Sequence, residues 1–138
     1  MAELEKALHT QITKLCADGD KEAARGEYKA AIAEYNKAWK LIPEPKNDWE
    51  ASTWILAAIG DVCFLGGFYD SAKKALRYAM TCPDAVGNPF LHLRLGQVQF
   101  ETQDLDASAD EFYMGGGDEI FASEDAKYLA FLKTRAKI

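Results

Sequence analysis

The sequence is poor in the residues that build metal, disulfide and catalytic sites. It contains two histidines and three cysteines. The cysteines are odd in number and share no C-x-x-C spacing, which argues against a disulfide framework and against a zinc knuckle. No phosphate-binding glycine loop, zinc-protease helix, serine-nucleophile elbow or calcium loop occurs. We therefore expect no catalytic residue, no metal and no cofactor, and a location in the reducing cytoplasm.

Long apolar runs and excess positive charge are also missing. The longest unbroken apolar run is six residues, 54–59, whereas a membrane span needs about 20. Residues 1–6 include two acids where a secretion signal would be basic and then apolar. Sixteen basic and 22 acidic side chains give a formal charge of −6, the wrong sign for a phosphate backbone. The expected partners thus include neither nucleic acid nor a membrane.

Valine is scarce while alanine is abundant. The chain has 3 valines and 22 alanines, and alanine favours helices whereas valine favours strands. A length of 138 residues, 49% of them hydrophobic, fits one domain with its own core and excludes global disorder. The composition therefore predicts a single all-α domain over residues 1–138.

A pattern of small and large residues occurs three times, around turns that begin at Gly26, Gly67 and Gln103. Each unit has a small residue seven positions before its turn start, and small, large and small residues five, nine and twelve positions after it. In the first unit these are Gly19, Ala31, Tyr35 and Ala38. In the second they are Gly60, Ala72, Leu76 and Ala79, and in the third they are Gly96, Ser108, Phe112 and Gly115. Small residues at helical spacing allow antiparallel helices to approach closely. The pattern predicts helices near 3–18, 27–41, 48–65, 69–81, 89–102 and 105–114, and a seventh after an N-cap at Ser123.

This pattern resembles the tetratricopeptide repeat, a helix–turn–helix unit of about 34 residues. The first unit matches best, from the turn at Gly26 to Pro43, while the third replaces the turn glycine by Gln103. About seven extra residues separate the first two units. The resemblance implies a right-handed solenoid of about three hairpins, with repeats at about 3–43, 48–82 and 89–116, and a C-terminal capping helix within 118–138.

In this family the first helix of each hairpin lines a concave face that binds partners. The resemblance assigns to that face and its acidic margin nine candidate partner-binding residues: Asp20, Trp54, Asp61, Phe64, Phe90, Gln97, Phe100, Glu101 and Asp104. Aromatic residues at helical spacing can equally pack between helices. We expect at least two of the four rings to reach the groove.

Negative charge is concentrated near the end of the chain. Residues 101–125 contain nine acids and no lysine or arginine, whereas the rest of the chain sums to +3. Such a stretch would attract a basic partner and accelerate its association. The alternative is an ordinary solubilising surface.

Two terminal segments, 112–121 (FYMGGGDEIF) and 124–132 (EDAKYLAFL), resemble the C-terminal signature of bacterial tetratricopeptide immunity proteins encoded beside polymorphic toxins, including the Rhs class. The resemblance implies a protein that binds a cognate, basic toxin domain and occludes its active or target-binding surface. The alternative is a small acidic secretion chaperone, or a scaffold adaptor, that holds an extended peptide. A co-chaperone that captures C-terminal carboxylates fits poorly, because Arg94 alone has a suitable charge on the corresponding faces.

Overall fold

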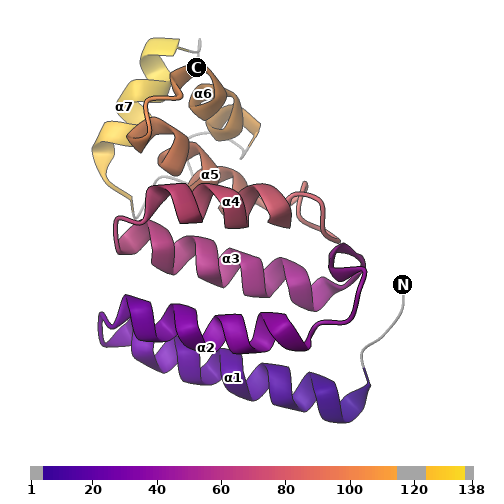
Figure 1. Ribbon diagram of the computed structural model, residues 1–138. Helices are drawn as coiled ribbons and strands as arrows, with labels where there is room; N and C mark the ends of the chain where they lie inside the picture. Colours follow the sequence, from indigo (N-terminus) through magenta and orange to yellow (C-terminus); the bar gives the residue numbers. More distant parts are fainter. Residues whose placement is uncertain (1–4, 115–123, 136–138) are drawn as a thin grey trace.

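The computed structural model describes residues 5–114 and 124–135, and all regular secondary structure in these residues is helical. The elements, shown in Figure 1, are α1 (Lys6–Ala24), α2 (Tyr28–Leu41), the short 3-10 helix η1 (Lys46–Asp48), α3 (Glu50–Leu65), α4 (Tyr69–Ala79), α5 (Pro89–Glu101), α6 (Leu105–Met114) and α7 (Ala126–Arg135). The all-α prediction is confirmed for this part of the chain.

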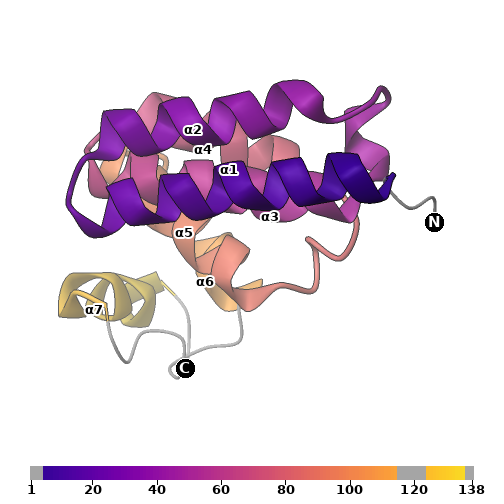
Figure 2. The same ribbon diagram turned by 90° about the horizontal axis from the view of Figure 1, so that it is seen from below.

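The first six α-helices pair as three hairpins, α1 with α2, α3 with α4, and α5 with α6, which follow one another in chain order (Figure 1). Neighbouring hairpins are in contact because α2 packs against α3 and α4 packs against α5. The last helix, α7, packs against α6 and lies at the end of the stack opposite α1 and α2 (Figures 1 and 2). None of the helices in the described residues combines the length and apolar character needed to cross a membrane.

The turns inside the three hairpins have the same backbone geometry. The N–H groups of Glu27, Phe68 and Asp104 each donate to the carbonyl five residues earlier, at 2.7 to 2.9 Å. The preceding residue has a positive φ in every case: 76° at Gly26, 80° at Gly67 and 67° at Gln103. The third unit thus makes the same turn as the other two, although its sequence departs from theirs.

The positive φ of Gln103 leads to a testable expectation. A side chain in the left-handed region costs about 1–2 kcal/mol, which glycine avoids. The substitution Gln103→Gly is therefore expected to raise the free energy of unfolding by about 0.5–1 kcal/mol, the range seen when a residue is matched to its backbone conformation. Urea denaturation monitored by circular dichroism measures this change, and a destabilised variant would contradict the expectation.

A glycine in the first helix of each hairpin touches a large side chain in the second. A Cβ atom built on Gly19, Gly60 or Gly96 would lie 2.5 Å from the side chain of Tyr35, Leu76 or Phe112, respectively. The partner stands 16 residues after the glycine each time. These contacts explain the small and large positions of the sequence pattern, because any larger side chain would wedge the two helices apart.

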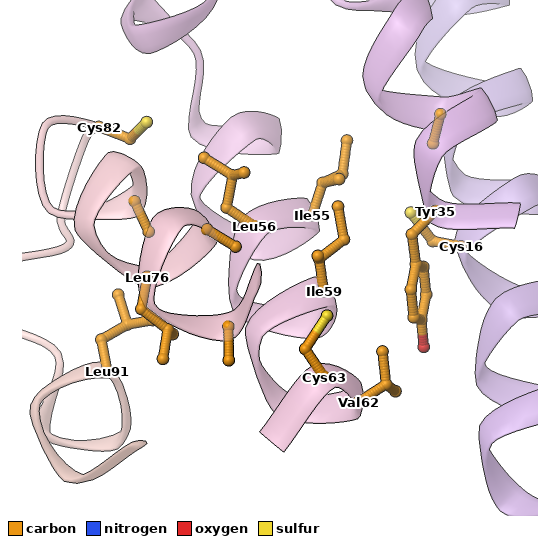
Figure 3. Packing of buried hydrophobic residues seen from close by; sticks show 14 of the residues in the cluster. Cys16, Tyr35, Ile55, Leu56, Ile59, Val62, Cys63, Leu76, Cys82 and Leu91 are labelled. Atoms are coloured by element: carbon orange, nitrogen blue, oxygen red, sulfur yellow. The ribbon is translucent and has the colours of Figure 1, made fainter. Parts of the chain in front are cut away.

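Buried side chains form one continuous core along the first five helices and a second cluster beneath α7. Figure 3 shows Tyr35 and Cys16 of the first hairpin facing Ile59 and Cys63 of α3. Leu76 lies on the other side of α3 and contributes to the same core. Apolar packing therefore makes a large contribution to holding the hairpins together.

The first helix differs most from the sequence prediction, whereas the ends of the next five predicted helices agree with the structure to within two residues. The first helix was predicted to end at residue 18 but continues to Ala24, because Gly19 lies inside the helix, where it faces Tyr35. The extra residues after Pro43 form η1, where the Lys46 ammonium donates to the carbonyls of Trp39 and Ile42 at 2.9 Å. Gly115, Ser123 and the rest of 115–123 lie outside the described residues.

Candidate functional site

The candidate site is the surface formed by the first helix of each hairpin, α1, α3 and α5, which we call the first-helix face. Side chains link these helices in order: the rings of His9 and Trp54 meet edge to face at 6.4 Å, and Asp61 binds Arg94. Two aromatic residues are exposed on it, Trp54 at 39% and Phe90 at 38%. Exposed rings of this size are typical anchors of protein interfaces.

Arg94 lies at the centre of the polar part of this face. Its Nε donates to Asp61 at 2.8 Å, and its Nη1 donates to Gln97 and to Glu124, both at 2.6 Å. The guanidinium also lies 4.9 Å from the ring centroid of Phe64 and 5.2 Å from that of Phe90. Arg94 thus joins α3, α5 and Glu124, two residues before α7, through charge-assisted hydrogen bonds and cation–π contacts.

Helix α7 covers part of the face that was predicted to be open. The hydroxyl of Tyr128 donates to Glu101 at 2.9 Å, and the ammonium of Lys127 lies 2.7 Å from the same carboxylate. The ring of Tyr128 contacts Phe64 and Phe100, with centroids 6.4 and 5.5 Å apart. The seventh helix was predicted as a terminal cap, but its contacts with α3 and α5 were not.

Gln97 requires a correction. It was predicted to line the groove, yet it is fully buried, because its amide donates to Glu124 at 2.6 Å while its oxygen accepts from Arg94. Phe64 and Phe100 are half-buried rings between helices. Of the four predicted groove aromatics, Trp54 and Phe90 are exposed.

The predicted acidic residues mostly have partners within the chain. On α1, Asp20 accepts a 2.5 Å hydrogen bond from the Tyr35 hydroxyl, while Asp61 and Glu101 pair with Arg94 and Lys127. Asp104 lies 3.9 Å from Arg77. These carboxylates help to hold helices together, which reduces the negative charge that they offer to a partner.

The acidic stretch 101–125 is likewise engaged in the described part of the chain. The Nδ1 atom of the buried His92 ring lies 2.7 Å from the Glu111 carboxylate, and its Nε2 atom lies 2.6 Å from the carbonyl oxygen of Val86. Glu124 binds Arg94. Asp118 and Glu119 lie outside the described residues. Several acids of the stretch thus also stabilise the third hairpin and α7, and the attraction of a basic partner stays a prediction.

A hollow of about 260 Å³ opens on the first-helix face, between the N-terminal half of α3 and the loop that leads into α5. Its lining consists of Glu50, Thr53, Trp54, Ala57, Pro83, Asp84 and Asn88. The amide oxygen of Asn88 also caps α5 by accepting the N–H of Phe90 at 2.9 Å. The sequence predicted Trp54 here but not the loop residues, since no periodic pattern extends through residues 83–88.

The cysteines are buried thiols. Burial raises the pKa of both Cys16 and Cys63 to about 11, and for Cys16 the nearby Asp20 carboxylate adds to the shift. A thiolate is the nucleophilic form of cysteine, so these side chains favour the unreactive state at neutral pH. Within 5–114 and 124–135, no group of three or more His, Cys, Asp or Glu residues is arranged to hold a metal ion.

No family model matches the chain, and no curated protein matches it significantly. The tetratricopeptide and immunity-protein resemblances stay predictions from the sequence.

Proposed function

We propose that this chain is a cytoplasmic tetratricopeptide immunity protein, a right-handed solenoid that binds a cognate secreted antibacterial toxin and occludes its active or target-binding surface. The observation that carries the proposal is the first-helix face, where Trp54 and Phe90 are exposed beside acidic residues on rigid helices. A preorganised surface of this kind loses little conformational entropy on binding. An inhibitor of this type needs no catalytic residue.

Further support comes from the way the face is held. Arg94 and its partners fix α3, α5 and the start of α7 relative to one another. The exposed rings of Trp54 and Phe90 therefore lie on helices held in fixed positions rather than on loops. The terminal segments that resemble immunity proteins include α7 itself. In this proposal α7 helps to fix the shape that the toxin recognises.

The experiment that tests the proposal is a survival assay in cells that express a candidate toxin taken from the genes that neighbour this one. Co-expression of this chain is expected to restore growth, and a mixture of the two purified proteins is expected to form a stable complex. Death of the cells despite soluble expression of both proteins would contradict an immunity role.

The alternative is a secretion chaperone or scaffold adaptor, and the exposed hollow beside Trp54 is the observation that favours it, because extended peptides place single side chains in such hollows. The two functions differ in the bound partner. A chaperone is expected to keep a secreted protein soluble through an extended segment, without any effect on toxicity.

Trp54 gives a direct test of the face. If its ring anchors the partner, Trp54→Ala is expected to weaken the complex by about 2–4 kcal/mol, the loss typical of an interface hot spot. Calorimetry measures the affinity, and an unchanged circular dichroism spectrum shows that the fold is intact. Tyr78→Ala is the matched control, because Tyr78 is equally exposed, at 41%, on α4. Equal losses in both variants would contradict an interface centred on Trp54.

A further inference from the structure

The hollow beside Trp54 has the size of a site for one side chain. Its volume is about 260 Å³, below the ~300–1,000 Å³ of sites that enclose small molecules and cofactors. It lies at the surface between α3 and residues 83–88, the segment that connects the second hairpin to the third. A single residue of a protein partner could enter it without any movement of the helices.

Hydrogen bonds within the chain hold the walls of the hollow in place. The hydroxyl of Thr53 donates to the carbonyl of Pro83 at 2.7 Å, which ties the loop to α3. Asn88 is occupied in capping α5. The Thr53 hydroxyl and the Asn88 amide oxygen therefore already have partners, and the apolar part of the lining consists of the indole of Trp54 and the surfaces of Ala57 and Pro83.

The charge of the hollow comes from Glu50 and Asp84. Within the described residues, neither carboxylate makes a hydrogen bond or an ion pair, in contrast to Asp61 and Glu101 on the same face, which are paired with Arg94 and Lys127. Two carboxylates in one small hollow repel each other unless a cation lies between them. The negative charge of the hollow is thus not compensated by any partner in the part of the chain that the structure describes.

We propose that this hollow receives an arginine side chain of the protein partner, an inference that rests on the proposed function. An arginine matches all three features of the site. Its planar guanidinium stacks on an indole ring and donates two parallel hydrogen bonds to a carboxylate, and its alkyl stem covers apolar surface. A lysine ammonium is a strongly hydrated point charge that stacks less well.

The test uses the isotopically labelled full chain and N-acetyl-arginine amide as the probe, followed by nuclear magnetic resonance. Saturable shifts are expected at the Trp54 indole N–H and at the amides of residues 50–57 and 83–88. N-acetyl-citrulline amide has nearly the same shape without the charge. Its binding is expected to be about tenfold weaker, because charge-assisted hydrogen bonds become neutral ones.

A variant removes the charge of the hollow while keeping its shape. The double substitution Glu50→Gln with Asp84→Asn is expected to weaken arginine binding about tenfold as well. Asp70→Asn with Asp110→Asn is the matched control, because these exposed carboxylates on α4 and α6 lie outside the hollow. The control is expected to bind the probe like the unmodified chain.

Several results would overturn the assignment: no saturable shift, equal binding of the citrulline probe, tighter binding of N-acetyl-lysine amide, or shifts confined to other parts of the chain. The partner itself separates this inference from the proposed function. If a toxin binds the Glu50→Gln and Asp84→Asn variant as tightly as the unmodified chain, the arginine site is wrongly assigned and the proposed immunity role is unaffected. If the arginine probe binds but the chain does not protect cells from the toxin, the immunity role is wrong and the arginine site in the hollow is retained.

Discussion

Replacing Phe112 by alanine is expected to lower the free energy of unfolding by about 3–5 kcal/mol, the usual cost of removing a buried phenylalanine. The ring is fully buried and lies against Gly96 of α5. It also meets the rings of Tyr128 and Phe131, with centroids 6.0 and 6.4 Å away. Its loss therefore leaves a cavity where α5, α6 and α7 meet. Chemical denaturation measures the change.

Met114→Ala is the matched control on the same helix. Its side chain is 58% exposed, so the free energy of unfolding is expected to change by no more than about 0.5 kcal/mol. If Phe112→Ala lowered the free energy of unfolding no more than Met114→Ala does, α6 would be only weakly docked. That result would contradict the packing described for the third hairpin.

Gly96 supplies a stricter test of the same contact. In the unmodified chain, Gly96→Ala is expected to destabilise, because the new Cβ would lie 2.5 Å from the rigid Phe112 ring. In the Phe112→Ala background the same methyl group has space, and alanine's higher helix propensity should make it neutral or stabilising. A double-mutant cycle measures this coupling. Equal effects of Gly96→Ala in both backgrounds would contradict a direct contact between the two residues.

Replacing Arg94 by alanine is expected to cost about 2–3 kcal/mol, somewhat less than the ~3–5 kcal/mol typical of a fully buried pair. The discount reflects Asp61, whose side chain is 33% exposed and can be rehydrated. Glu124 and Gln97 would lose their guanidinium partner in a more enclosed environment. Because Arg94 holds the start of α7, hydrogen exchange of the α7 amides is expected to accelerate more than that of α2.

Arg77→Ala is the control for charge alone. Its guanidinium is 58% exposed and lies 3.9 Å from Asp104, and exposed pairs contribute at most about 1 kcal/mol. Unchanged exchange of α7 in the Arg94→Ala variant would show that this helix is held by its apolar contacts alone, and the central position given to Arg94 would be wrong.

The sequence predicted the hairpins well because their contacts repeat. A glycine and a large residue 16 positions apart occur in every unit, and the structure joins each pair, as with Gly60 and Leu76. Even the third turn kept its geometry with Gln103 in place of glycine. Local periodicity carries this information, since both partners lie within one hairpin.

The repeat pattern did not predict the contacts between different hairpins. Arg94 binds Asp61, 33 residues earlier, and Glu124, 30 residues later, and no period in the sequence relates these three residues. Gln97 was therefore expected at the surface although it is buried under Glu124. A single arginine in an otherwise uncharged stretch of α5 was the one available signal, because a charge among apolar residues needs a partner when buried.

We expect a polypeptide partner to bind the first-helix face without any chemical step. The most direct measurement is co-purification of the full chain from its native host, in parallel with the Trp54→Ala variant, followed by identification of the bound polypeptide. The account predicts that the unmodified chain retains a basic toxin domain in a one-to-one complex and that the variant loses it. Recovery of the same toxin by both chains, or of an extended secreted segment in its place, would contradict it.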